Sequence, residues 1–231
     1  MRIAKASLQD WESIRRISSV SGYDDYIGKI GPSYLKDGTV LAVYDTELIA
    51  FMKLEFLRDR SVWLSGLRVD PSRRREGIAT YLTKGGLEHA RSKGCTVARM
   101  IISATNTPSV NLAKRLGFQP ILDYQFYEGA VDTSGFSLLE EVPRYPLFLV
   151  WKVMIPDSNM KVEGRYLVRG ESRMFLTESG DTTYYHLLSG NDFSFTEGDS
   201  IIVVERGRFH LTNMKRLDGF EEGLVFQKFL I

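Results

Sequence analysis

The chain has 231 residues, of which 43% are apolar and 26% charged, the composition of an ordinary globular protein. With 30 basic and 29 acidic residues the net charge is +1, which argues against a dedicated nucleic-acid or membrane-surface protein. The single cysteine, Cys95, excludes an intramolecular disulfide framework and suits a reducing compartment. Because His89, His186 and His210 are far apart in sequence, no local metal-ligand cluster is visible, and we expect no metal.

The amino-terminal residues carry no apolar stretch of signal-peptide type. No window approaches the roughly 20 apolar residues that a membrane helix needs. We therefore expect a cytoplasmic protein without nucleic-acid or membrane partners.

The first elements alternate between strand and helix patterns. Arg2–Ala6 predicts a short strand, and Ser7 with Asp10 three positions on predicts a helix start. The buried stripe of that helix is expected at Trp11, Ile14, Ile17 and Val20. Ser21–Gly38 is expected to be helical or irregular, with apolar surface from Tyr23, Tyr26, Ile27, Ile30, Tyr34 and Leu35. Two strands joined by a hairpin follow at Thr39–Tyr44 and Leu48–Leu57.

The next four expected elements are a strand, a helix, a strand and a short helix, at Val62–Val69, Gly77–Arg91, Thr96–Ser103 and Pro108–Leu116. The short helix has recognisable ends. Thr107 is expected to cap it, Pro108 fits its first position, and Gly117 can take the left-handed conformation that stops it.

Beyond Phe118 the pattern changes. Leu147–Ile155 predicts a strand, and the polar segment Pro156–Glu163 predicts a linker. Short apolar runs then alternate with turn signals, with strands expected at Ile201–Val204, Phe209–Thr212 and Leu224–Leu230. The sequence thus predicts two domains: a mixed α/β domain at residues 1–155 and a β-rich accessory domain at 156–231.

A strand that leads through a basic loop into a glycine-opened helix occupies residues 67–79. Backbone N–H groups at a helix start have no intrahelical partners, and the helix dipole adds positive charge there, so the natural ligand is a pyrophosphate. Gly77 permits close backbone approach and Ala79 keeps the first turn open. An arginine triplet is more often a solvated turn, but the position of Arg73–Arg75 between strand and helix favours anion binding.

This loop resembles the signature [Gln/Arg]-x-x-Gly-x-[Gly/Ala] of the GNAT acyltransferase superfamily, filled here by Arg74, Gly77 and Ala79. The later segment Asn106–Phe118, an asparagine followed by a helix and Leu-Gly-Phe, is similar to another superfamily motif. One helix and one strand separate the two, as in the superfamily. The resemblance covers roughly residues 1–130, and it implies a twisted mixed sheet flanked by helices.

The resemblance implies acetyl-CoA as cosubstrate and an amine as acceptor. Backbone groups of Leu67, Arg68 and Val69 would pair with the pantetheine arm and polarise the thioester carbonyl. The cofactor's pyrophosphate would be held by amides of the loop and first turn, namely Arg74, Arg75, Glu76, Gly77, Ile78, Ala79 and Thr80. Asn106 and Ser109 would also contact the cofactor. Independently, Gly66 inside a strand suggests a bulge, which in this superfamily opens the cofactor slot.

The expected catalytic groups depart from the superfamily pattern. Many members place a tyrosine seven residues after the asparagine to protonate the departing thiolate, and here that position is Ala113. Tyr124, Tyr127 or solvent would have to serve instead. A glutamate base on the strand before the loop would fall near Trp63, so Glu55 on the preceding strand is our candidate base.

Two functions stay open on the sequence alone. The first is an N-acetyltransferase in which an amine attacks the thioester directly. The second, prompted by Ala113, is a non-catalytic acyl-CoA-binding regulatory or interaction module. The carboxy-terminal region could cover the acceptor pocket, form a homodimer, or be a degenerate partner domain. P-loop and dinucleotide-binding fingerprints are missing from the sequence.

Overall fold

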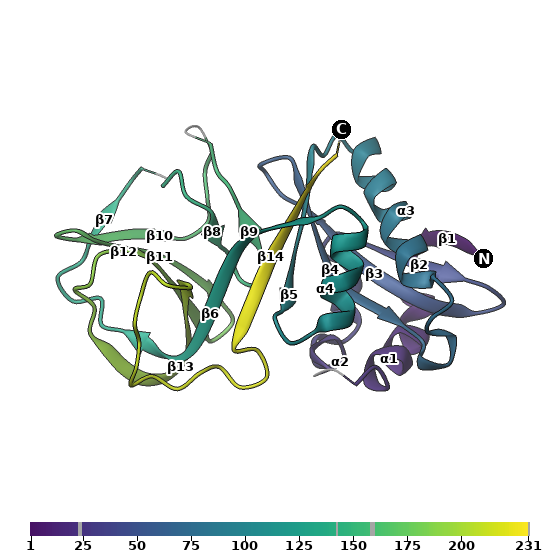
Figure 1. Ribbon diagram of the computed structural model, residues 1–231, viewed down its shortest axis with the longest axis horizontal. Helices are drawn as coiled ribbons and strands as arrows, with labels where there is room; N and C mark the ends of the chain where they lie inside the picture. The colour runs from purple at the N-terminus through teal and green to yellow at the C-terminus, as the bar shows by residue number, and fades with distance from the viewer. Residues whose placement is uncertain (23–24, 142, 158–159, 231) are drawn as a thin grey trace. The chain divides into compact units, whose positions relative to one another are not determined.

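The computed structural model describes residues 1–22, 25–141, 143–157 and 160–230 (Figure 1). Tyr23 and residues 158–159 of the expected linker therefore lie outside the described residues. Contacts between Cα atoms divide the chain into two compact units. Unit 1 contains residues 1–100, 112–118 and 228–231, and unit 2 contains residues 101–111 and 119–227. Residues 119–155 are thus grouped with the tail and not with the first hundred residues.

The sheet of unit 1 runs in the order β1-β2-β3-β4-β5. Its strands are β1 (Arg2–Lys5), β2 (Thr39–Tyr44), β3 (Leu48–Phe56), β4 (Ser61–Val69) and β5 (Val97–Ser103). The first four pair antiparallel, and β4 pairs parallel with β5. This mixed sheet confirms the expected fold class, and its strand bounds agree with the sequence predictions to within one residue.

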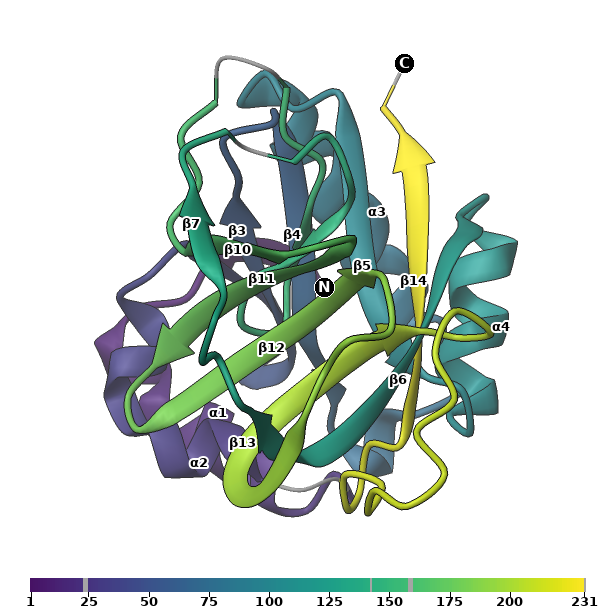
Figure 2. The ribbon, with the colours of Figure 1, turned by 90° about the vertical axis from the view of Figure 1, so that its left-hand side faces the viewer.

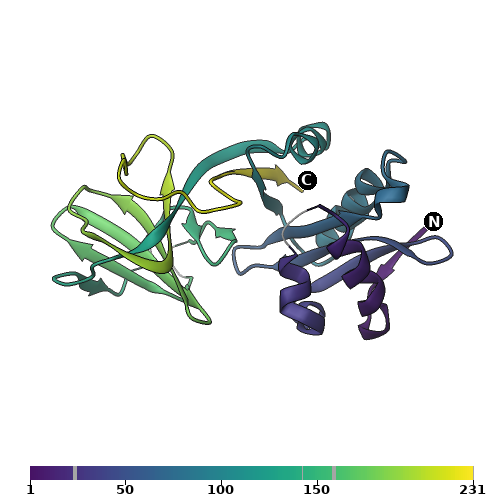
Figure 3. The same ribbon diagram turned by 90° about the horizontal axis from the view of Figure 1, so that it is seen from below.

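Helical segments precede, interrupt and follow these strands. They are η1 (Leu8–Asp10), α1 (Trp11–Ser19), α2 (Tyr26–Ile30), η2 (Gly31–Leu35), η3 (Pro71–Arg73), α3 (Ile78–Ser92) and α4 (Thr107–Arg115). Helices α1 and α2 cover one face of the unit 1 sheet and α3 covers the other (Figure 3). A methyl group on Gly86 of α3 would lie 2.6 Å from the Met52 side chain, so this glycine lets α3 pack closely on β3.

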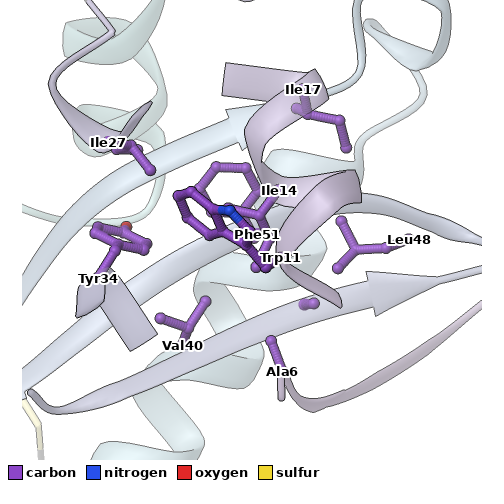
Figure 4. Close-up of a cluster of buried hydrophobic side chains, with 10 residues drawn as sticks. Ala6, Trp11, Ile14, Ile17, Ile27, Tyr34, Val40, Leu48 and Phe51 are labelled. Carbon is purple, nitrogen blue, oxygen red and sulfur yellow. The ribbon is translucent and has the colours of Figure 1, made fainter. Parts of the chain in front are cut away.

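The core beneath α1 and α2 is formed by alternate residues of the sheet and by one stripe of α1 (Figure 4). Trp11, Ile14 and Ile17 are buried there, as the helical spacing predicts. Val20 is 53% exposed, and its expected place in the stripe is wrong because α1 ends at Ser19. Helix α2 contributes Ile27, which is fully buried.

The short helix α4 begins one residue earlier than predicted. The Asn106 side-chain oxygen accepts a hydrogen bond from the Ser109 amide at 3.2 Å, so Asn106 caps the helix and the expected cap Thr107 is its first residue. Gly117 has a φ of +80°, which confirms the predicted left-handed stop.

Unit 2 is built almost entirely of strands, in the order β14-β6-β13-β12-β11-β10-β7 (Figure 2). The strands are β6 (Gln119–Val131), β7 (Ser137–Leu139), β10 (Arg165–Arg169), β11 (Ser172–Ser179), β12 (Thr182–Ser189), β13 (Phe195–Glu205) and β14 (Glu222–Phe229). Neighbours pair antiparallel except β12 with β13. The predicted strands at Ile201–Val204 and Leu224–Leu230 are confirmed within β13 and β14.

Two predicted strands of unit 2 are wrong. Leu147–Ile155 is a hairpin of two short strands, β8 (Leu147–Phe148) and β9 (Val153–Met154), joined by a turn at Val150 and Trp151. Both turn residues have positive φ, 48° and 64°, and the Trp151 ring stacks on Phe126 at 5.2 Å between centroids. Phe209–Thr212 is irregular, although Phe209 is buried.

Candidate active site

Strand β4 is bulged at the glycine that the sequence singled out. Phe51 of β3 faces Arg68 and Lys53 faces Ser65, so Gly66 and Leu67 together oppose the single residue Met52. Gly66 has a φ of +61°, the left-handed conformation typical of the first residue of a glycine bulge. The expected bulge is thus present.

The pairing of β4 with β5 is short. It runs from Ser61 opposite Val97 to Trp63 opposite Arg99 and goes no further in the described residues. On that edge, the peptide groups from Leu64 to Val69 have no ladder partner in the part of the chain that the structure describes. The predicted positions Leu67, Arg68 and Val69 lie in this segment and are half-buried. The Leu67 carbonyl accepts a hydrogen bond from the Arg68 guanidinium at 3.1 Å. The segment's other backbone groups on that edge can bind an extended ligand such as a pantetheine arm.

The loop after β4 is anchored by Asp70. Its carboxylate accepts hydrogen bonds from the Ser72 amide at 3.0 Å and the Ser72 hydroxyl at 2.7 Å. A third bond comes from the Arg16 guanidinium of α1 at 2.8 Å. The Ser72 hydroxyl and Arg16 hold the pKa of the Asp70 carboxyl below its usual range. The loop start is therefore fixed to both α1 and its own backbone.

The three arginines of the loop have different partners. Arg73 binds the Glu76 carboxylate through two nitrogens at 2.9 Å and also reaches Asp45 at 3.3 Å. Arg74 donates to the Ser21 carbonyl at 2.9 Å. Within the described residues, no hydrogen bond or ion pair engages the exposed Arg75 guanidinium.

The ion pair between Arg73 and Glu76 affects anion binding, because Glu76 is a negatively charged residue within the predicted phosphate loop. Arg73 holds the pKa of the Glu76 carboxyl below its usual range. Glu76 thus stays ionised, but its charge is balanced by Arg73, so it opposes an incoming phosphate less than a free carboxylate would. Arg75 remains as the positive side chain available to a ligand.

The backbone of the loop turns left-handed twice before the helix. Arg75 has a φ of +73° and Gly77 a φ of +79°, and Gly77 is followed directly by the helical Ile78. For arginine this conformation is unfavourable by about 1–2 kcal/mol. A left-handed residue followed by a helical one turns successive N–H groups toward a common point, which makes an anion-binding concavity.

The start of α3 supplies further donors. Gly77 is the N-cap and offers no side chain, and the first intrahelical bond is donated by Tyr81 to the Gly77 carbonyl at 3.0 Å. The amides of Ile78, Ala79 and Thr80 precede that bond. The Ile78 side chain is buried, so only its backbone can face a ligand, whereas Arg74, Glu76 and Gly77 are exposed. The structure thus brings the predicted residues 74–80 together.

Glu55 lies at the end of β3, opposite Trp63, and is half-buried. It shares a sheet face with Phe51 and Lys53, the face covered by α1 and α2. Burial, and then the nearby Tyr26, raise the pKa of the Tyr34 phenol well above its usual range, and the charge of Glu55 adds to that rise. Glu55 is therefore close to the tyrosines beside the bulge.

The other residues that the sequence proposed for the site differ in burial and in local contacts. Asn106 and Ser109 are half-buried in unit 2, with Asn106 capping α4. Ala113, at the position of the usual tyrosine, is 1% exposed. Tyr124 is buried in unit 2 against Phe148 and His186, where burial raises the pKa of its phenol above the usual range. Such a phenol is a poor proton donor.

Tyr127 is likewise buried in unit 2. It is 4% exposed in unit 2, under the Arg216 guanidinium at 4.4 Å, and its hydroxyl lies 3.4 Å from the Gln125 side chain.

Sequence reasoning missed the anchor Asp70–Arg16 and the tyrosine pair Tyr26 and Tyr34. For Asp70 a signal existed, since an Asp-Pro-Ser turn predicts an aspartate that caps the loop. The pairing with Arg16 spans 54 positions and leaves no local pattern. The sequence pattern indicates Tyr26 and Tyr34 only as apolar surface.

No metal or membrane feature accompanies this site. Among the described residues, no group of three or more His, Cys, Asp or Glu side chains could hold a metal ion. In that same part of the chain, the helices are all too short or too polar to cross a membrane.

Comparison with known proteins gives matches to acetyltransferases. A relative, the mycothiol acetyltransferase of Saccharopolyspora erythraea, is 34% identical over 83 residues, which cover 35% of this chain and 27% of the relative. The match thus spans about a quarter of that protein's length.

Two solved structures extend the comparison. The crystal structure of an inferred acetyltransferase from Thermoplasma acidophilum aligns with a TM-score of 0.68 at 19% identity, over 99% of this chain and 100% of that one. The overall fold, tail included, therefore recurs in that protein. The PaiA N-acetyltransferase of the same organism, solved with coenzyme A, aligns at 18% identity over 52% of this chain and 90% of that one, with a TM-score of 0.45.

The match to a family profile is the most direct. Residues 7–118, which hold the bulged strand, the loop and the start of α3, match the acetyltransferase (GNAT) family. The chain therefore carries a domain of the acetyltransferase (GNAT) family at residues 7–118.

Proposed function

We propose that this chain is an N-acetyltransferase that transfers an acetyl group from acetyl-CoA to a primary amine. One observation carries the proposal: the start of α3, with left-handed Gly77 as its N-cap, follows a bulged strand that has no ladder partner on one edge beyond Trp63 in the described residues. A diphosphate on an extended arm fits these two features together, because one offers converging amides and the other offers strand-like backbone groups.

Each part of the site has a role in this proposal. The amides of residues 74–80 hold the pyrophosphate, and the Arg75 guanidinium adds charge at an exposed position. Backbone groups of Leu67, Arg68 and Val69 bind the pantetheine arm. No metal takes part, and the single cysteine Cys95 is 7% exposed and is given no role.

The chemistry assigned to the chain is positioning and proton removal. Acetyl-CoA supplies the activated acetyl group as a thioester. Backbone N–H groups of β4 stabilise the negative charge that develops on the carbonyl oxygen as the amine adds. Glu55 takes the proton from the attacking nitrogen, directly or through a water molecule. The adduct then collapses to the amide as its carbon–sulfur bond breaks, and coenzyme A leaves as a thiolate that takes a proton from solvent. Holding the amine and the thioester in one site removes most of the entropy cost of their encounter.

A second candidate function is an acyl-CoA-binding module without turnover. The observation that favours it is Ala113, which is buried and carries no acid where many family members have a tyrosine. The acetyltransferase and the binding module would both bind acetyl-CoA. They differ only in whether an amine acceptor causes release of coenzyme A. We place either activity in the cytoplasm, since the lone, buried cysteine suits a reducing compartment.

The test combines binding and turnover on the full chain. Calorimetry measures the affinity for acetyl-CoA, and a thiol reagent measures coenzyme A release across amino acids, polyamines, aminoglycosides and peptides with free amino termini. We expect tight binding and thiol release that depends on one amine class. Tight binding with no acceptor-dependent release would favour the binding module, and a folded chain that does not bind acetyl-CoA would contradict both.

A further inference from the structure

The Tyr34 hydroxyl is a buried polar group without a hydrogen-bond partner. Tyr34 lies in η2 and is 2% exposed, with its ring packed edge-on against Phe51 at 6.2 Å between centroids (Figure 4). In the described part of the chain, no group accepts from or donates to its oxygen. The Tyr26 hydroxyl is a close neighbour that interacts electrostatically with this phenol, but its position does not meet the distance and angle of a hydrogen bond. Phenylalanine would fill the same space without burying an unsatisfied hydroxyl, so this oxygen needs an explanation.

The hydroxyl points at the bulge of β4. A methyl group on Gly66 would collide with the Tyr34 hydroxyl and lie 3.1 Å from the Tyr26 hydroxyl. Because Gly66 carries no side chain, the phenol and the bulged backbone stand directly against each other. The hydroxyl therefore reaches the strand segment that we assign to the thioester end of the cofactor.

The surroundings keep this phenol protonated. Burial raises its pKa well above the usual range, and the neighbouring Tyr26 and Glu55 add to the rise. The positive charge of Arg68, whose guanidinium lies 5.9 Å from the centroid of the Tyr26 ring, opposes part of this rise but does not cancel it. A neutral phenol whose ring is buried in the core and whose hydroxyl meets a strand is arranged to donate a hydrogen bond and not to lose its proton.

We propose that the Tyr34 hydroxyl donates a hydrogen bond to the thioester carbonyl oxygen of acetyl-CoA bound along β4. This inference rests on the proposed function and adds a side-chain donor to the backbone donors of the strand. The bond strengthens as negative charge develops on that oxygen, so Tyr34 lowers the barrier to amine addition. No proton leaves the phenol in this role.

The test is Tyr34→Phe, which keeps the ring and removes only the oxygen. We expect the melting temperature of the ligand-free protein to stay level or rise by about 2–4 °C, because an unsatisfied buried group is removed. Affinity for acetyl-CoA should fall by roughly 2- to 10-fold, the effect of one lost hydrogen bond, while affinity for coenzyme A should not change. The turnover number should fall by about 100-fold.

Tyr44→Phe serves as the matched control, since Tyr44 is a half-buried tyrosine on β2 whose ring stacks with Arg2 and does not approach Gly66. It should leave the ratio of acetyl-CoA to coenzyme A affinity as in the parent. A Tyr34→Phe protein that is less stable and has an unchanged affinity ratio would overturn the inference alone, because the hydroxyl would then be structural. A parent chain that binds neither ligand would overturn the proposed function and this inference with it.

Discussion

Gly77 and Gly94 allow a sharp test of the phosphate site, because they stand at opposite ends of α3 in the same backbone conformation. Their φ values are +79° and +83°, and a methyl group added to either would meet no atom within 4 Å. Replacing each by alanine introduces left-handed strain of about 1–2 kcal/mol. About 0.5–1 kcal/mol is regained from the smaller entropy of the unfolded chain. Both variants should therefore lose about 1 kcal/mol of unfolding free energy.

The two variants should differ only when the ligand is present. At Gly77 the methyl group occupies the open space in front of the helix amides, where the pyrophosphate would approach. The loss of one hydrogen bond to a charged group, about 1.5–3 kcal/mol, corresponds to roughly 10- to 100-fold weaker binding of acetyl-CoA. Gly77→Glu adds a carboxylate in that space and should abolish binding. Gly94→Ala should bind like the parent protein.

Urea denaturation gives the two stabilities and calorimetry gives the two affinities. The informative quantity is the difference between the alanine variants, since the strain common to both cancels. If folded Gly77→Ala and Gly94→Ala bind acetyl-CoA equally well, the start of α3 does not hold the cofactor and the proposed function loses its main support.

Three further outcomes are expected. Glu55→Gln should lower the turnover number by about 10²- to 10⁴-fold and alter the acidic limb of the pH–rate profile; an unchanged profile would remove Glu55 as the base. Asp70→Asn should cost on the order of 1–3 kcal/mol at pH 7. Because the folded-state pKa of Asp70 is depressed, this loss of unfolding free energy should shrink as the pH falls below 3.8. Denaturant unfolding at several pH values measures the loss, and a loss that stays constant would contradict the Arg16 and Ser72 contacts. Burial, helped by Arg208, lowers the pKa of His186 to about 3, so unfolding should take up a proton and the free energy of unfolding should decrease as the pH is lowered from 6.5 to 3. The denaturant midpoint of the parent should decrease over this pH range, and that of His186→Gln should lack this contribution.

Much of unit 1 could be predicted because its elements are specified locally. Periodic apolar residues and a left-handed glycine end fix the helices, and the hairpin between β2 and β3 follows from alternation and a short connection. The loop at residues 70–77 could be predicted as an anion site for the same reason: a strand end, a basic turn and a glycine are adjacent in sequence.

The sequence predicted wrong strands where tertiary packing outweighs the secondary-structure preference of the residues. Val150 and Trp151 favour strand by composition, yet both take positive φ in a two-residue turn. Trp151 lies against Phe126, Phe148 and Phe220, with ring centroids 5.1–5.8 Å away, and Phe126 and Phe220 are far from it in sequence. Phe209 is buried without belonging to a strand, which no periodicity can indicate.

The candidate site could be predicted only in its backbone part. Residues 74–80 act through amides, and their order along the chain is the signal. The Tyr34 hydroxyl becomes visible as a functional group only when Gly66 is seen to stand against it, 32 positions away in a different element. Side chains that meet across a sheet leave no spacing rule in the sequence.

The division of the chain also constrains how the protein forms during synthesis. The chain crosses from one unit to the other after residues 100, 111, 118 and 227, so unit 1 is not one continuous segment of the sequence. Within unit 1, Lys228 donates to the Leu116 carbonyl at 2.6 Å and Leu230 donates to the Thr96 carbonyl at 2.8 Å. A ribosome-bound chain that had emerged only to residue 155 would lack these bonds. The family domain at residues 7–118 can therefore form these two bonds only after all of the second unit has been made.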